Sequence, residues 1–265
     1  MNESLQLDVD RLKNSIEPQM VNTIYFDELE STNTWALENL EAHQVPSLVV
    51  TANQTAGRGQ RGNEWHSSGG SLTFSLALSF EDIAIESRGI IAPAVAVACC
   101  RFLSKLTEDG SYQFKWPNDL VLKDRKLGGI LIETTSRLNE TLVIGIGINV
   151  NQNPWLPNPS TSKLEPVSLA QVFEKPFDLT EVLTGLVQEI VDLPAQIRSG
   201  NRGQLMSEID ERNWLKDQNV LVESEGKKRL GRFVGLDESG AARIDSGGEI
   251  STFHSANITK HDGIG

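Results

Sequence analysis

A glycine-rich, cationic segment is the first part of this 265-residue sequence that could carry chemistry. It reads Gln54-Thr55-Ala56-Gly57-Arg58-Gly59-Gln60-Arg61-Gly62-Asn63-Glu64-Trp65. Glycines at every second or third position prevent a regular element and leave backbone N–H groups free to converge on an anion, and the two arginines supply charge-assisted hydrogen bonds. The segment lacks the Lys-Ser/Thr of a Walker loop and the spacing of the dinucleotide fingerprint. By itself it fits an anion-binding loop or an ordinary surface loop equally well.

A second segment combines a turn with cationic side chains. It consists of Lys115-Trp116-Pro117-Asn118-Asp119 and, after four residues, Asp124-Arg125-Lys126-Leu127-Gly128-Gly129-Ile130. Pro-Asn-Asp is typical of a turn between strands. A strand lysine followed by two glycines could hold an ammonium group beside a ligand that lies against bare backbone, where lysine acts as a mobile point charge. The alternative is a hairpin with a surface lysine.

Two further segments are weaker signals. In Gly145-Ile146-Gly147-Ile148-Asn149 the glycines predict a strand with one flat face, and Asn149 carries a donor and an acceptor suited to a base edge or an amide. The alternative for this strand is close packing on a helix. Glu30-Ser31-Thr32-Asn33 predicts, when taken alone, only a helix cap.

The elements that must position these segments alternate between strands and helices. Alternation at Leu72, Phe74, Leu76, Leu78 and Phe80 predicts a half-buried strand. A small-residue helix is expected over 87–106, and further helices near 168–172, 179–198 and 204–215. Short strands separated by Gly or Asp turns from residue 219 onward predict a small β-barrel.

This pattern predicts a polar leader over residues 1–20, a large domain over 21–217 and a small β-barrel domain over 218–265. The fold class expected is α/β (α+β).

Composition excludes several classes of protein. The net charge of −12 disfavours wholesale nucleic-acid binding, because that affinity comes from a basic surface. The longest apolar stretch, over 89–100, is interrupted by Pro93 and is far shorter than the roughly 20 residues of a membrane span. The N-terminus lacks the features of a secretory signal, and the adjacent Cys99 and Cys100 suggest buried, reduced thiols. We therefore expect a cytoplasmic protein that binds neither DNA nor membranes.

Taken together, in this order and at these intervals, the four segments resemble the biotin protein ligases, in the monofunctional form that lacks an N-terminal DNA-binding domain. The resemblance covers roughly residues 23–258 and rests on Ser-Thr-Asn, Gln-x-x-Gly-Arg-Gly, Lys-Trp-Pro-Asn-Asp with Lys-x-x-Gly-Ile-Leu, and Gly-x-Gly-Ile-Asn. It implies that residues 21–217 form a catalytic domain, of the biotin/lipoate ligase type, that binds biotin and ATP on a mixed sheet. It also implies an ATP-dependent ligase that activates biotin as biotinyl-5'-AMP and transfers it to a lysine of a biotin carboxyl carrier protein. Mg²⁺ would arrive with ATP and not on fixed protein ligands. The resemblance is compatible with a homodimer.

The resemblance also implies roles for individual residues. Catalysis would fall to Arg58, Lys126 and Asp119, the last of which would orient or deprotonate the incoming lysine. The biotin site would be formed by Ser31, Thr32, Asn33, Gln54, Gly57, Arg58, Gly59, Gln60, Trp65, Lys126 and Gly129. The nucleotide site would be formed by Arg61, Asn118, Gly147 and Asn149.

One residue departs from the family pattern, and two other functions compete. Position 60 is Gln, where bacterial members often carry Arg, and our hypothesis is that Arg61 or Mg²⁺ supplies the missing positive charge.

A lipoate or octanoyl ligase or transferase has a related fold, but its linear acyl chain would need an apolar tunnel. The polar side chains Ser31, Thr32, Asn33 and Gln54 argue against such a tunnel. A nonenzymatic RNA-binding module is disfavoured by the net charge.

Overall fold

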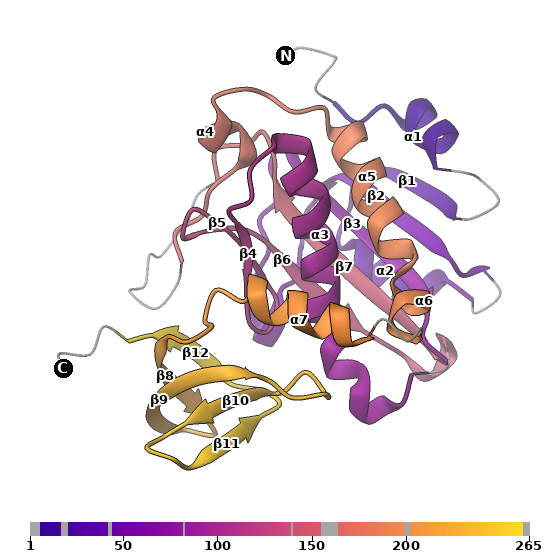
Figure 1. Cartoon of the computed structure of the whole chain (residues 1–265). Helices are drawn as coiled ribbons and strands as arrows, with labels where there is room; N and C mark the ends of the chain where they lie inside the picture. The colour runs from indigo at the N-terminus through magenta and orange to yellow at the C-terminus, as the bar shows by residue number, and fades with distance from the viewer. Residues whose placement is uncertain are drawn as a thin grey trace.

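The computed structural model describes residues 6–16, 21–41, 44–81, 83–138, 140–154, 164–198 and 202–261. They form a large α/β unit and a smaller all-β unit (Figure 1). The strands of the larger unit are β1 (Asn22–Leu29), β2 (Ser47–Gln54), β3 (Ser71–Ser79), β4 (Tyr112–Lys115), β5 (Asp119–Leu122), β6 (Arg125–Glu133) and β7 (Thr141–Asn149). Their order is β1-β2-β3-β7-β6-β5-β4. Because β1 and β2 are parallel and the other pairs antiparallel, the expected mixed sheet is confirmed.

Helices cover both faces of this sheet. The even-numbered side chains of β3, such as Phe74 and Leu76, join the main core with α3 (Ile91–Thr107) and α5 (Leu179–Val191). The other face carries α2 (Thr32–Asn39) and a smaller apolar cluster. The prediction that β3 is half-buried is therefore wrong, since Thr73 and Ser75 on its polar side are also buried. The polar side of the alternation faces a covered site and not bulk water.

Helix α3 explains why hydropathy alone would mislead here. Together with the preceding 3-10 turn η4 (Ile85–Ile90), it is long and apolar enough to cross a membrane by length and composition. Within this fold it lies between the sheet and the helices that pack on it, and most of its side chains are buried in the core. Cys99 and Cys100 are buried with them, and burial raises the pKa of Cys100 to about 12, so this thiol stays protonated.

The predicted polar leader contains a helix that belongs to the larger unit. Helix α1 (Val9–Ser15) packs on α5, and its side chain Leu12 is fully buried, as is nearly all of Ile16. Asp8 caps α1, and its backbone N–H donates to Thr180 Oγ1 at 2.8 Å. Residues 1–5 and 17–20 of the leader lie outside the described residues.

The helices after β7 follow the predicted order with one division. They are α4 (Leu169–Phe173), α5, α6 (Leu193–Arg198) and α7 (Arg202–Arg212). The single helix predicted over 179–198 is interrupted at Asp192. The interruption follows from Pro194, which has no N–H to donate to Ile190 and whose ring would clash with that carbonyl.

The C-terminal strands form a separate antiparallel sheet. Its strands are β8 (Asn219–Ser224), β9 (Lys227–Leu236), β10 (Ala242–Asp245), β11 (Ile250–Phe253) and β12 (Asn257–Lys260), in the order β11-β10-β9-β8-β12. The short β12 was not predicted, because four residues with a single buried side chain, Ile258, carry little alternation. The sheet is joined to the larger unit by Trp116 Nε1, which donates to the Gly240 carbonyl at 3.0 Å.

An ion-pair network holds α7 on α3. Glu208 accepts from Arg101 at 2.5 and 2.8 Å and from Arg212 at 3.1 Å. Burial alone would raise the pKa of Glu208, but the two guanidinium groups more than offset it and hold the pKa below its usual range. The carboxylate therefore stabilises the fold at pH values above the unfolded pKa, and this stabilisation is lost as the pH falls through the lower folded pKa.

We expect Glu208→Gln to lower the free energy of unfolding by about 1–3 kcal/mol at pH 7. Chemical denaturation at pH 7 and below pH 4 measures the free energy of unfolding of the variant and of the unmodified protein. The difference between the two free energies should shrink at the acidic pH. Glu211→Gln on the same helix, where the carboxylate accepts only from the exposed Ser207, is the matched control. A pH-independent loss in Glu208→Gln would contradict the role of its charge.

Candidate active site

A cluster of neutral polar side chains lies where α2 begins. Ser31 caps the helix, and Thr32 donates from its backbone N–H and its hydroxyl to Gln54 Oε1 at 2.8 and 3.1 Å. Ser75 Oγ, from β3, lies 2.7 Å from Thr32 Oγ1 and 2.6 Å from Asn33 Oδ1. The fold brings together four residues predicted for the biotin site, and all four are buried: Ser31, Thr32, Asn33 and Gln54.

Asn33 lies directly on the backbone of β7. A Cβ atom at Gly145 would be 2.3 Å from Asn33 Oδ1, so this strand position must be glycine for the amide to lie there. Asn33 Nδ2 donates to Glu133 Oε2 at 2.9 Å, and the same oxygen accepts from Arg58 Nη2 at 2.7 Å. Glu133 thus connects the neutral cluster to the first cation of the glycine-rich segment.

The glycine-rich segment folds back over the sheet. Trp65 N–H donates to the Gly57 carbonyl at 2.9 Å, and a Cβ at Gly57 would be 2.4 Å from the Trp65 carbonyl oxygen. The Trp65 indole lies on Gly147 of β7, where an added Cβ would be 2.3 Å from the ring. The bare positions of β7 are therefore occupied by Asn33 and Trp65, two residues predicted for the biotin site.

The tip of this segment turns toward the smaller unit. Gly59 N–H donates to the Asn63 carbonyl at 2.7 Å, and Gln60–Gly62 form a 3-10 turn, η3. Arg61 has a positive φ of 56° and donates from Nη2 to Ser255 Oγ, beside β12, at 2.9 Å. The guanidinium of Arg61 is thus directed at the C-terminal sheet, and its compensation for Gln60 stays a prediction.

The second cation lies on the β5–β6 hairpin. Lys126 Nζ is 2.5 Å from Asp119 Oδ1, and both side chains are partly exposed, at 34% and 23%. Asp119 is paired across the hairpin with Gly129. A Cβ at Gly129 would meet Lys126 Nζ at 3.8 Å and Asp119 Oδ1 at 4.0 Å, which are ordinary contact distances. Space therefore remains between this ion pair and the strand backbone.

Two predicted nucleotide-binding amides are engaged within the protein. Asn118 Nδ2 donates to the Ile130 carbonyl at 2.8 Å and helps to close the turn between β4 and β5. Asn149 is buried, donates to the Val167 carbonyl at 3.1 Å and accepts from Gln152 Nε2 at 2.6 Å. Their contact with a nucleotide remains a prediction.

The register shows that these groups share one sheet face. Directly opposed residues in antiparallel strands point to the same side. One row across the sheet consists of Thr51, Thr73, Gly147, Gly129, Asp119 and Lys115. On this face the neutral polar cluster is followed, within neighbouring strands, by a bare backbone position and an ammonium group.

Such a face can hold a polar, uncharged ring at one end and an anionic group at the other.

The sequence analysis missed two residues of this site, Ser75 and Glu133. The alternation of Ser and Thr with Leu and Phe in β3 is a signal that could have identified Ser75. No local pattern distinguishes Glu133 from an ordinary strand-end carboxylate.

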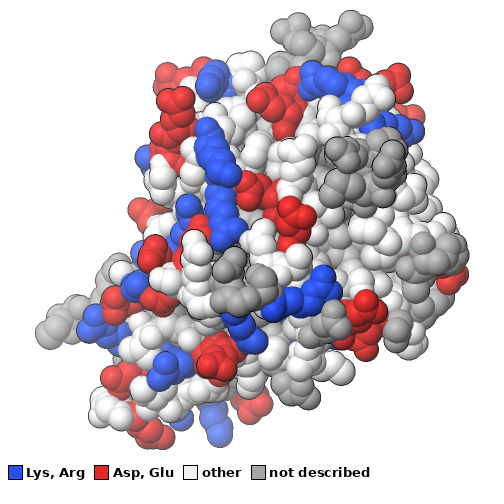
Figure 2. All heavy atoms as spheres, turned by 45° about the vertical axis from the view of Figure 1, so that its right-hand side comes forward, with Lys and Arg blue, Asp and Glu red and all other residues white. Residues whose placement is uncertain are grey.

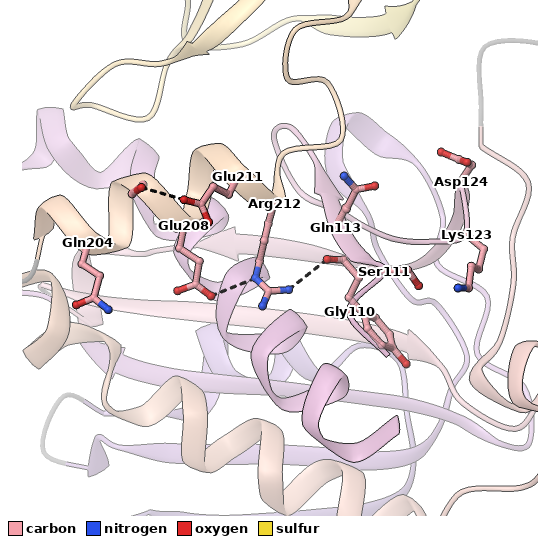
Figure 3. Close-up of a pocket in the computed structure, with 11 residues that line it drawn as sticks. Gly110, Ser111, Gln113, Lys123, Asp124, Gln204, Glu208, Glu211 and Arg212 are labelled. Atoms are coloured by element: carbon pink, nitrogen blue, oxygen red, sulfur yellow. Dashed lines mark hydrogen bonds and ion pairs between the residues drawn. The ribbon is translucent and has the colours of Figure 1, made fainter. Parts of the chain in front are cut away.

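A surface pocket lies away from this face. It encloses about 800 Å³ between α7 and the β4–β5 hairpin (Figure 3). Its wall carries side chains that are already paired, such as Arg212 with Glu208 and Lys123 with Asp109.

Among the described residues there is no group of three or more His, Cys, Asp or Glu side chains able to hold a metal ion. Figure 2 shows acidic and basic side chains interspersed over one face, without a large patch of one sign.

Comparison with known proteins agrees with this geometry. A model of the biotin/lipoate A/B protein ligase family matches residues 24–151, the part that holds the polar cluster, the glycine-rich segment and Lys126. The biotin protein ligase of Aquifex aeolicus in complex with biotin and ATP superposes with a TM-score of 0.77 at 27% identity, over 91% of this chain and 98% of that one. Over these ranges the chain is similar to biotin protein ligases.

Other relatives in this family match over different lengths. The bifunctional ligase/repressor BirA of Salmonella typhimurium is 34% identical over 147 residues, which are 54% of this chain and 45% of that protein. The chain therefore covers less than half of that relative. The biotin–acetyl-CoA-carboxylase ligase of Mycobacterium tuberculosis is 26% identical over 80% of this chain and 77% of its own length.

Proposed function

We propose that this protein is an ATP-dependent ligase that activates biotin as biotinyl-5'-AMP and transfers it to a lysine of a biotin carboxyl carrier protein in the cytoplasm. One observation carries the proposal: a neutral polar cluster around Asn33 lies on the same sheet face as the Lys126–Asp119 ion pair. Biotin has matching ends, because its ureido group is polar and uncharged and its carboxylate is anionic. Relatives of this fold bind biotin with ATP.

In the first step, a carboxylate oxygen of biotin attacks the α-phosphorus of Mg²⁺-bound ATP. The new oxygen–phosphorus bond forms as the bond to the β-phosphate breaks, and pyrophosphate leaves with the electron pair. Negative groups crowd together, so cations that bind them most strongly in the transition state accelerate the step. Lys126 and Arg58 would have this role, with Glu133 holding Arg58 until the ligand arrives.

In the second step, the carrier lysine attacks the acyl carbon of the mixed anhydride and AMP leaves. The attacking amine must lose a proton, and Asp119 is the carboxylate nearest to Lys126 in this structure. Its closest partner is the ammonium group, so Asp119 would orient Lys126 and, in the second step, orient the incoming amine and accept the proton that it loses. The segment over 57–65 would exclude water from the anhydride.

A lipoate or octanoyl ligase is the second candidate, because the family model covers both kinds of ligase. The buried side chains Thr32, Asn33, Gln54 and Ser75 disfavour it. These side chains already bond to one another, and their remaining donors and acceptors suit a polar ureido group, whereas a linear acyl chain has no polar group to meet them.

Pyrophosphate release from ATP and Mg²⁺ with biotin or lipoate tests the proposal. We expect release with biotin and only background release with lipoate. A carrier domain with its target lysine replaced by Arg is the control for the transfer step. Release with lipoate alone would overturn the assignment to biotin.

A further inference from the structure

Lys115, at the end of β4, is a buried lysine that the proposed mechanism does not use. Only 8% of it is exposed. It is opposite Asp119 in the hairpin, so its side chain projects from the same sheet face as Asp119 and Lys126. No hydrogen bond or ion pair joins its Nζ to any residue in the described part of the chain.

Within the described residues, an ammonium group in this position lacks the hydrogen-bonded partner that burial demands. A buried charge is costly unless it is paired, and the nearby carboxylate of Asp119 is already bonded to Lys126. The pKa of Lys115 is lowered, chiefly by burial. The negative charge of Asp119 opposes this shift, and the positive charge of Lys126 adds to it. The three groups carry two positive charges and one negative charge, and an anion bound beside them would balance the excess.

The order of strands indicates which anion this is. The polar cluster around Asn33 lies over β7, Lys126 lies on β6, and Lys115 lies on the edge strand β4. In an in-line displacement the leaving group departs on the side of phosphorus opposite the attacking oxygen. With the biotin ring over β7 and the α-phosphate at Lys126, the β- and γ-phosphates extend toward β4. Strands are spaced about 4.8 Å apart, so Lys115 is within side-chain reach of them.

We infer that Lys115 binds the β- and γ-phosphates of ATP and the pyrophosphate that leaves. This inference rests on the proposed function. When the bond between the α-phosphorus and the bridging oxygen breaks, that oxygen keeps both electrons and the charge on pyrophosphate increases. Lys115 stabilises this charge without giving up a proton. Lys126, by contrast, holds the groups that remain in the adenylate, so the two lysines have separable tasks.

The test compares the two half-reactions in Lys115→Met, which keeps the length of the side chain and removes its charge. With saturating biotin, we expect the KM for ATP in pyrophosphate release to rise by about 30-fold, as for loss of one buried charge contact. Transfer of preformed biotinyl-5'-AMP to a biotin carboxyl carrier domain should remain within about twofold of the unmodified protein. Lys115→Arg should restore most of the ATP affinity.

Two controls separate this inference from other outcomes. Lys123→Met removes an exposed lysine of the same hairpin, paired with Asp109, and should change neither half-reaction. Calorimetric titration with inorganic pyrophosphate and Mg²⁺, without biotin, reads the site directly, and Lys115→Met should bind at least about tenfold more weakly. An unchanged pyrophosphate affinity, or equal losses in both half-reactions, would overturn the inference. Pyrophosphate binding that depends on Lys115, without any biotin-dependent release, would instead reject the proposed function alone.

Discussion

Lys126→Ala should lower the rate of biotin-dependent pyrophosphate release by about 10²- to 10³-fold, which corresponds to about 2.7–4 kcal/mol of transition-state stabilisation. The ammonium group of Lys126 is the charge that lies over the open backbone at Gly129 and is held there by Asp119. Its removal leaves the carboxylate of biotin and the α-phosphate of ATP to approach each other with one cation fewer. Initial rates at saturating biotin and ATP measure the loss.

The fold should survive this substitution. The backbone of Lys126 bonds to Glu165 at 2.7 Å and to Val167 at 2.9 Å, and neither bond involves the side chain. Thermal unfolding of Lys126→Ala should therefore match that of Lys123→Ala, which removes the paired surface lysine three residues earlier. If Lys126→Ala kept a rate within about twofold of the unmodified protein, its charge would have no part in the first step.

Gly129→Val should leave the fold intact and still slow adenylate formation by about 10²-fold, the cost of displacing reacting groups by about 1 Å. A Cβ at this position makes only ordinary contacts, at 3.8–4.0 Å, with Lys126 and Asp119 in the ligand-free protein. A β-branched residue also suits a strand. The added methyl groups would, however, fill the space in which a ligand approaches the backbone of β6.

Gly129→Val therefore separates a functional glycine from a structural one. Gly147→Val is the contrasting variant, because its Cβ would overlap the Trp65 ring and should lower the melting temperature. Thermal unfolding and pyrophosphate release measured on both variants make the comparison. Full activity in Gly129→Val would mean that no ligand comes close to this strand.

The sequence predicts contacts well where the partners lie within one motif. Lys126 and Asp119 belong to one hairpin, and Ser31 caps the helix that its position predicts. The strands and helices follow from their periodicity and turn residues, whereas the mixed sheet was predicted from the family resemblance. These features depend on interactions between residues that are close in the chain.

Contacts that depend on the register between distant strands were not predictable. Ser75 reaches Asn33 only because β3 pairs with β7, which places Gly145 beneath the amide. Glu133 reaches Arg58 across 75 positions of sequence. Arg61 bonds to Ser255 only because the second sheet docks beside the glycine-rich segment. The sequence contains the residue types that make these contacts, but it does not reveal the register between distant strands that brings the residues together.

The docking of the N-terminal leader on the larger unit was also not predictable from the sequence. Its composition is polar, yet Leu12 and Ile16 are buried against the core. Two apolar residues separated by four positions match one helical face, but they are too few to predict docking. The Arg11–Asp178 ion pair and the hydrogen bond from Asp8 to Thr180 then fix the helix on α5.

A crystal structure of this chain with biotinyl-5'-AMP bound would test the central claim most directly. The account predicts the ureido ring beside Asn33 and Ser75, and the acyl phosphate over Gly129 within hydrogen-bond distance of Lys126. It also predicts that Arg58 has exchanged Glu133 for the ligand. An adenylate bound on another face of the sheet, with Lys126 still paired to Asp119 alone, would contradict the account.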